Sequence, residues 1–205
     1  MNIDFAREAD SKKLAILHYG ARSRLPDSFM ISLGPTFLNA YYRAILKTPN
    51  SFVICSRTNL GEIEGFISGT LDASVELQHL RQNKMHFLLC AIPVLLLRPG
   101  LLIGMYKRMV GKDSKGNFFI EDKGARIGFW CWREGVGAGG NAIVLFKKWL
   151  QIADCLGFSE VYGEVDADNK KLLTMHSVLG GKFIKKYQTP EGRDRMIVLY
   201  KSKHL

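Results

Sequence analysis

The sequence predicts a mixed α/β protein of the α+β type, and three observations support that prediction. The chain has 205 residues, of which 47% are hydrophobic and 23% are charged, proportions typical of a folded globular chain. Stretches with the period of strands are interspersed with stretches that have the period of helices. A glycine-rich stretch at 134–140 joins a strand-like run to an apolar helix. We therefore expect one domain covering residues 1–205.

The first 71 residues contain two helices between strand-like runs. Ser11 can cap the first helix, and Pro35 suits the first turn of the second. The turn Thr58-Asn59-Leu60-Gly61 separates two runs that predict a hairpin. The strands expected here cover 3–9, 51–57 and 63–71.

Residues 74–112 differ from the rest because they are helical in pattern and strongly apolar. We expect Pro93 to interrupt the most hydrophobic run and Arg98-Pro99 to close it. That run is too short to span a membrane. Two interpretations stay open: a helical hairpin packed on the domain, or a basic, apolar surface at 81–108 that makes peripheral contact with a membrane or a partner.

The remaining chain predicts strands and helices in alternation, followed by a strand pair. The expected strands cover 118–120, 125–132, 159–165, 182–187 and 196–200, and the expected helices cover 141–153 and the stretch from an Asp168 or Asn169 cap to Leu179.

The stretch Glu134–Gly140 carries four glycines directly before a helix. Bare backbone N–H groups and the positive end of the helix dipole together favour an anion, most simply a phosphate. Gly135, Gly137 and Gly140 also fit the G-x-G-x-x-G pattern of dinucleotide-binding oxidoreductases, which need further strand–helix units. A P-loop is excluded because Asn141 follows the last glycine. A turn without a ligand is the third interpretation.

Composition limits the partners and the compartment. The formal net charge is +10, which favours anionic partners, but the basic residues are dispersed and we expect no nucleic acid. The four cysteines form no C-x-x-C pair and the five histidines do not cluster, so we expect no metal. The first residues lack the form of a signal peptide, and a reducing cytoplasm is the expected location.

The order of these elements, with three motifs, resembles the GNAT superfamily of N-acetyltransferases. The loop Glu134–Gly139 matches the family's phosphate-cradling loop, although Glu134 stands where Arg or Gln is usual. The stretches Glu164–Asn169 and Leu179–Phe183 match the motifs that follow. The resemblance covers most of the chain outside 74–124. It implies a central mixed, mostly antiparallel sheet flanked by helices, with a helical insertion at 74–112 after the third strand.

The resemblance also implies the transfer of an acetyl group from acetyl-CoA to a small-molecule amine. His176 stands at the position of the family's tyrosine and is the candidate acid for the thiolate, while Glu121 or Asp122 is the candidate base. A backbone N–H of the strand 129–132 could stabilise the oxyanion. The residues expected to bind the coenzyme are Phe129, Trp130, Cys131, Trp132, Arg133, Val136, Gly137, Ala138, Gly139, Gly140 and Asn169.

The segment Leu25–Phe29 with Tyr41–Arg43 resembles GNAT members linked to bacterial surface-polysaccharide synthesis. It implies an acceptor pocket framed by Asp27, Ser28 and Phe29, and an amino sugar as the acceptor. Two alternatives remain: a GNAT-like module that senses a ligand or docks on a membrane without turnover, and a dinucleotide-binding oxidoreductase. We expect a monomer or a homodimer.

Overall fold

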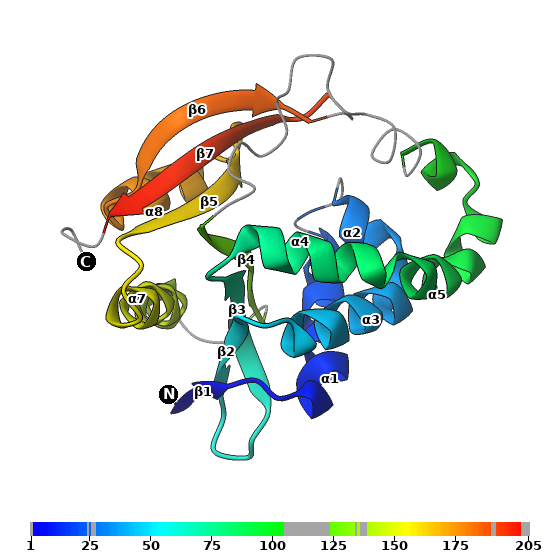
Figure 1. Cartoon of the computed structure of the whole chain (residues 1–205), viewed down its shortest axis with the longest axis horizontal. Helices are drawn as coiled ribbons and strands as arrows, with labels where there is room; N and C mark the ends of the chain where they lie inside the picture. Colours follow the sequence, from blue (N-terminus) through cyan, green and yellow to red (C-terminus); the bar gives the residue numbers. More distant parts are fainter. Residues whose placement is uncertain are drawn as a thin grey trace.

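The computed structural model describes residues 2–23, 25, 28–104, 124–133, 135, 139–189 and 192–201. Within them, one sheet has the strand order β1-β2-β3-β4-β5-β7-β6 (Figure 1). Every neighbouring pair is antiparallel except β4 and β5, which run parallel. The mixed, mostly antiparallel sheet is confirmed. The strands are β1 Asn2–Phe5, β2 Ser51–Arg57, β3 Ile63–Thr70, β4 Ala125–Trp132, β5 Glu160–Asp166, β6 Lys182–Gln188 and β7 Asp194–Lys201.

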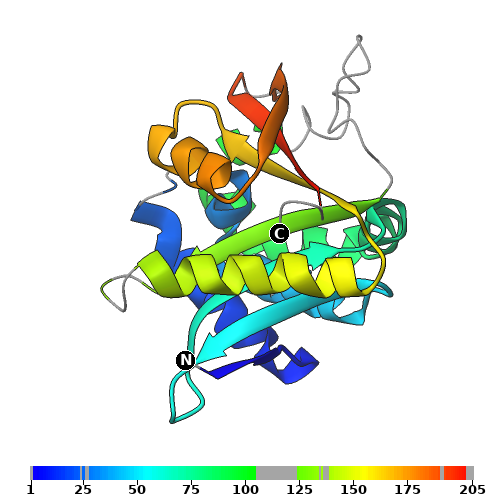
Figure 2. The same cartoon turned by 90° about the vertical axis from the view of Figure 1, so that its left-hand side faces the viewer.

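Helices cover both faces of the sheet. α1 and α3 pack on one face of β2, β3 and β4, and α7 packs on the other face, along which it runs in Figure 2. α8 lies with α7 on the side of β5 and β7. The helices are α1 Ser11–Gly20, α2 Phe29–Ser32, α3 Gly34–Lys47, α4 Ala73–Gln82, α5 Lys84–Leu97, α7 Gly139–Cys155 and α8 Lys170–Val178.

The core beneath α7 is closely packed. Trp149 is completely buried and stacks on Phe52, with ring centroids 4.9 Å apart. A Cβ atom on Gly69 would lie 2.4 Å from the Trp149 ring, so this strand position accepts only glycine without a shift. This contact fixes the helix against the centre of the sheet.

The helical insertion predicted after the third strand is present as α4 and α5. The Asp72 carboxylate caps α4 by accepting from the N–H groups of Ser74 (2.9 Å) and Val75 (3.3 Å). The prediction that Pro93 interrupts the next helix is wrong, because α5 continues through it. Pro93 has no N–H to donate to the carbonyl of Leu89, so α5 lacks that one hydrogen bond. The predicted end at Arg98-Pro99 is confirmed.

The first strand is shorter than predicted. β1 ends at Phe5, and Glu8–Asp10 form a 3-10 turn. Arg57 holds this turn through Asp10 (2.9 Å) and also pairs with Asp4 (2.8 Å). The strand expected at 118–120 lies outside the described residues. No helix in the described ranges has the length and apolar character to cross a bilayer.

Candidate active site

The two parallel strands separate soon after they meet. β4 and β5 pair at Ala125 with Val161 and at Arg126 with Tyr162, and no later pair follows in the described chain. Beyond that point β5 turns away with β7 and β6 (Figure 1). Residues 127–130 of β4 therefore have no strand partner on the β5 side among the described residues, which leaves backbone groups directed into a gap.

Hydrogen bonds to β3 show which β4 groups face this gap. The N–H of Phe129 donates to Ser68 Oγ (2.8 Å) and the N–H of Arg133 donates to the Glu64 carbonyl (2.6 Å). Because the backbone groups of alternate residues point to opposite edges of a strand, the N–H and carbonyl of Trp130 point toward β5. A bound chain with amide groups could pair with them as an added strand.

Trp130 offers a second donor beside the same edge. Its Nε1 is buried and has no hydrogen-bond partner in the described part of the chain. A buried polar group without a partner is costly, and this indole N–H could donate to a ligand that carries an acceptor. The pantetheine arm of a coenzyme A thioester has amide carbonyls of this kind, and the residues present therefore fit that group.

Side chains on β4 divide between the two faces of the sheet. Phe129 and Cys131 pack in the cluster with α1 and α3, whereas Trp130 and Trp132 pack in the cluster with α7. All four had been expected to bind the coenzyme. The structure places Trp130 beside the gap.

The glycine-rich loop is described only at its ends. Glu134, Val136, Gly137 and Ala138 lie outside the described residues, so the expected pyrophosphate contacts there remain a prediction. Gly135 has a φ of 73°, a conformation that suits glycine. Gly139 and Gly140 form the start of α7, which has no acidic residue in its first turn. A Cβ atom on Gly140 would meet no described residue within 4 Å, so the helix start is open as far as the described residues go.

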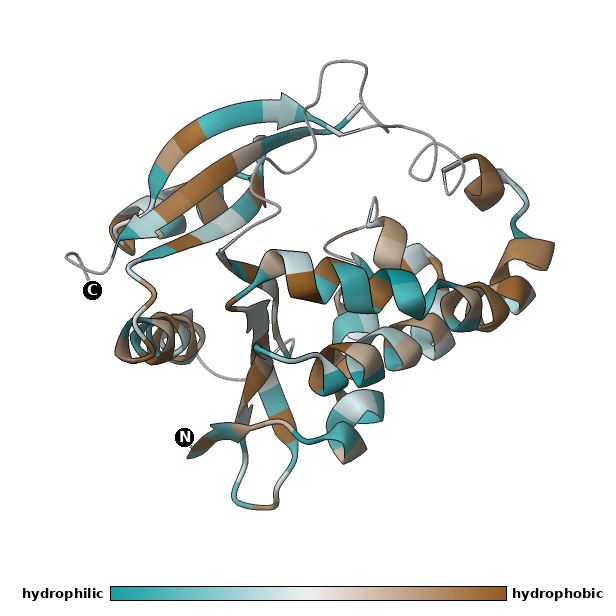
Figure 3. Cartoon of the chain, in the orientation of Figure 1, coloured by the Kyte–Doolittle hydropathy of each residue, from teal (hydrophilic) through white to brown (hydrophobic). Residues whose placement is uncertain are grey.

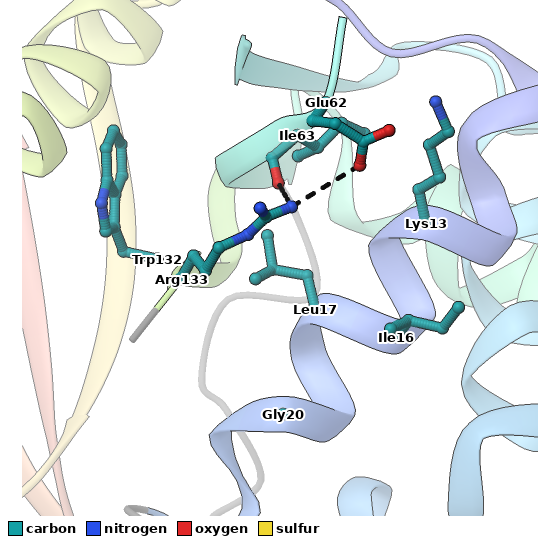
Figure 4. Close-up of a pocket in the computed structure, with 8 residues that line it drawn as sticks. All are labelled: Lys13, Ile16, Leu17, Gly20, Glu62, Ile63, Trp132 and Arg133. Atoms are coloured by element: carbon teal, nitrogen blue, oxygen red, sulfur yellow. Dashed lines mark hydrogen bonds and ion pairs between the residues drawn. The ribbon is translucent and has the colours of Figure 1, made fainter. Parts of the chain in front are cut away.

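Arg133, the expected phosphate ligand, is engaged elsewhere. Its guanidinium donates to the Ile63 carbonyl (2.9 Å) and lies 3.7 Å from Glu62. These groups line an open groove of about 450 Å³ with Trp132 and residues of α1 (Figure 4). Ile63 belongs to β3, on the side of β4 away from β5, so phosphate binding by Arg133 would require a different rotamer.

His176, the candidate acid, is only 7% exposed. Its Nδ1 is hydrogen-bonded to the Tyr200 hydroxyl. Burial lowers the pKa of His176 to about 4, so the imidazole is neutral at pH 7. This pKa lies well below the ordinary imidazole value of about 6.5. A neutral ring can still donate from Nε2 if the Tyr200 hydroxyl donates to Nδ1.

A row of aromatic rings connects His176 to the gap. Trp130 meets Phe146 edge-on with centroids 5.2 Å apart, and Phe146 meets His176 in the same way at 5.7 Å. The rings come from β4, α7 and α8. His176 therefore lies on the α7 side of the sheet, two ring contacts away from Trp130.

Asn169 caps α8, as one of the two sequence interpretations predicts. Its side-chain oxygen accepts from the N–H of Leu172 (3.0 Å). The same residue lines an open polar groove of about 610 Å³ with Asp166 and Arg193. Its expected contact with the coenzyme remains a prediction.

A charged group on β5 is a feature that the sequence did not predict. Val161 and Val165 are buried against α7 and α8, so the alternate residues Glu164 and Asp166 point to the opposite face. Arg195 pairs with both carboxylates, at 3.2 Å and 3.1 Å. Strand alternation could have located these carboxylates, but not the gap beside them.

The expected acceptor and base residues are only partly described. Asp27, Glu121 and Asp122 lie outside the described residues. Ser28 precedes α2 without capping it, and Phe29 packs beside Gly104 of the insertion. Within the described ranges, no group of His, Cys, Asp and Glu could hold a metal ion.

Comparisons with known proteins support the fold. No family model matches the sequence, and no curated protein matches it. Among solved structures, one described as an acetyltransferase has a TM-score of 0.60 at 15% identity, covering 98% of this chain and 99% of its own. Ribosomal-protein-alanine N-acetyltransferase from Brucella melitensis has a TM-score of 0.60 at 10% identity, covering 98% and 99%. Aminoglycoside 6'-acetyltransferase type Ii has a TM-score of 0.59 at 11% identity, covering 98% and 97%.

These likenesses extend over almost the whole length of both partners. The dinucleotide-binding alternative is not favoured, because that fold is built on a mostly parallel sheet and this sheet is mostly antiparallel. The diverging parallel pair, the open start of α7 and the strand order occur together in a chain similar to several acetyltransferases. The protein thus has the fold of the GNAT N-acetyltransferases.

Proposed function

We propose that this protein transfers an acetyl group from acetyl-CoA to a primary amine. The observation that carries the proposal is the gap between β4 and β5, where the Trp130 backbone and its buried indole N–H lack partners in the described chain. The fold shared with N-acetyltransferases supports it. The thioester supplies an activated acyl group, and this chain's residues hold and orient the two substrates.

Binding would use backbone groups more than side chains. The Trp130 edge of β4 would pair with the amide-containing arm, and its N–H could donate to a carbonyl oxygen in the gap. Loss of such a donor typically costs ~2.7–4 kcal/mol of transition-state stabilisation. The loop residues Val136 to Gly140, with the start of α7, would hold the pyrophosphate.

Glu164 is the described residue best placed to receive the amine proton. It lies two positions beyond Tyr162, the last β5 residue paired with β4, and at about 3.3 Å per residue this places it where the strands part. Its pairing with Arg195 fixes its position. Glu121 remains a proposed base from the resemblance.

The His176–Tyr200 pair would serve the leaving thiolate. Because the imidazole is neutral at pH 7, it would donate from Nε2–H, with the Tyr200 hydroxyl holding Nδ1. Tyr200 is 1% exposed, so we assign it a positioning role.

The acceptor we propose is an amino sugar on an anionic carrier, as in a surface-polysaccharide pathway. The net charge of +10 suits an anionic carrier. Asp27, Ser28 and Phe29 would frame the pocket.

The test combines acetyl-CoA calorimetry with a thiol-release assay on a panel of amines: a nucleotide-linked amino sugar, a free amino sugar, a polyamine and a peptide. We expect acetyl-CoA to bind and the nucleotide-linked amino sugar to give the fastest release. Binding without release on any amine would favour the sensing module, and absence of binding would refute the transferase.

A pair of tryptophan variants tests the gap itself. Trp130→Phe removes the indole N–H and should weaken acetyl-CoA binding about fivefold, the effect of one hydrogen bond. Trp149→Phe is the matched control, because Trp149 Nε1 is also buried without a partner among the described residues but lies in the core over Gly69. Equal affinities in the two variants would show that the coenzyme does not use the indole N–H of Trp130.

A further inference from the structure

The helix α5 has an apolar surface on both sides. On one side Ala91 and Leu95 are 0% and 6% exposed and pack with Leu33 and Phe37. Phe87 meets Phe37 with ring centroids 5.8 Å apart. This side of α5 packs on α3 and on residues of α2.

The opposite side of α5 is apolar and uncovered. Figure 3 shows the hydrophobic colouring of α5 continuing into the helical residues after it, at one end of the molecule. The spacing of 85, 88, 89, 92 and 96 places these positions on one helical stripe. The exposed fractions are Met85 61%, Leu88 37%, Leu89 61%, Ile92 40%, Leu96 78%, Leu97 83%, Leu102 49% and Ile103 62%.

The charged residues in this part of the sequence all have one sign. No aspartate or glutamate occurs between Glu76 and Asp113. Arg81, Lys84 and Arg98 flank α5, are exposed, and form no ion pair within the described residues. An uncovered apolar stripe with unpaired cations at both ends is complementary to a surface that is apolar inside and anionic outside.

An apolar stripe with cations at both ends favours binding to a lipid surface over spanning the bilayer or forming a dimer. α5 has 14 residues, about 21 Å of helix, which is too short to span a bilayer. A symmetric dimer through this stripe would bring the same patch of two copies together, and with it the cations Arg81, Lys84 and Arg98 of both copies. Anionic lipid headgroups instead attract each lysine or arginine.

We propose that α5 lies in the surface of an anionic membrane, with the stripe from Met85 to Leu97 in the acyl boundary and Arg81, Lys84 and Arg98 at the headgroups. The proposal does not depend on catalysis. A helix with an apolar face and basic flanks binds such an interface without spanning it.

Vesicle flotation of the full chain tests this proposal. Vesicles of phosphatidylglycerol and phosphatidylcholine should carry the protein upward at low salt, whereas pure phosphatidylcholine should carry much less. Each basic residue removed should lower the partition coefficient roughly fivefold. The triple variant Arg81→Gln, Lys84→Gln, Arg98→Gln is compared with Lys12→Gln, Lys147→Gln, Lys148→Gln, which loses the same charge at other exposed positions.

A second pair of variants tests the apolar stripe. Leu89→Glu with Leu96→Glu should lower partition by about tenfold or more. The control is Leu60→Glu, because Leu60 is 91% exposed in the β2–β3 turn. Thermal unfolding checks that each variant is folded. The proposal would be overturned if the protein floats equally with both lipid mixtures, or if the control variants lose as much flotation as the α5 variants. It would also be overturned if the protein is a dimer that only the α5 variants dissociate.

Discussion

Each face of the sheet buries one histidine against one tyrosine, and the two pairs differ in their surroundings. His18 Nδ1 lies 2.8 Å from the Tyr42 hydroxyl beneath α1 and α3, and His176 Nδ1 is bonded to the Tyr200 hydroxyl on the α7 side. In both pairs the partners are 24 residues apart. The sequence spacing is therefore identical, and only the fold separates their roles.

The surroundings favour the His176–Tyr200 pair for the proposed site. His18 is 0% exposed and its Nε2 has no partner in the described chain. It packs at 4.4 Å on Phe129, on the side of β4 away from α7. His176 is 7% exposed and connects through Phe146 to Trp130 at the gap. We therefore assign His18–Tyr42 to the core and His176–Tyr200 to the site.

Acid should destabilise both pairs, and this is the largest effect we expect. Burial lowers the pKa of each histidine from 6.5 to about 4. The unfolded chain then binds more protons than the folded chain between these values, so stability is complete above pH 6.5 and falls as the pH drops toward 4. The full shift corresponds to roughly 3 kcal/mol per histidine.

Urea unfolding at several pH values measures this loss. His176→Gln and His18→Gln should each reduce the slope of the free energy of unfolding against pH between 6.5 and 4. An unchanged slope in either variant would mean that its histidine is already protonated in the folded protein, which would remove the neutral-imidazole role of His176.

The tyrosine variants separate the pairs by function. Tyr42→Phe and Tyr200→Phe each leave a buried imidazole nitrogen unpaired, and each should cost about 1–2 kcal/mol of stability. Only Tyr200→Phe should also lower kcat, on the order of tenfold, and alter the pH profile of turnover. Without the Tyr200 hydroxyl at Nδ1, the proton of the neutral His176 ring is no longer held on Nε2. The measurement is thiol release per folded protein, with His176→Ala beside it. A matching loss of kcat in Tyr42→Phe would remove the distinction between the pairs.

The sequence was sufficient for features that depend on neighbouring residues. The strand predicted at 125–132 is β4, and of the two predicted caps, Asp168 and Asn169, Asn169 is the one observed. Features set by distant residues could not be predicted. The separation of β4 from β5 depends on how β5 pairs with β7, a strand that lies far away in the sequence. The lowered pKa of His176 depends on burial beside Phe146 and Tyr200. Pro93 was expected to break a helix that tertiary packing on α3 maintains.

The smallest expected effect concerns Arg133, which directly follows β4 and lies on its α1 side. Its side chain is 42% exposed and pairs weakly with Glu62 at 3.7 Å, so Arg133→Gln should change stability by less than about 1 kcal/mol. If the Ile63 carbonyl holds the guanidinium as observed, acetyl-CoA affinity should also stay within about twofold of the parent, since ~0.4 kcal/mol is a factor of two. Calorimetry with acetyl-CoA and with its dephosphorylated analogue measures this. A loss of tenfold or more, confined to the phosphorylated ligand, would show that Arg133 leaves β3 to bind phosphate and that the site extends across both sides of β4.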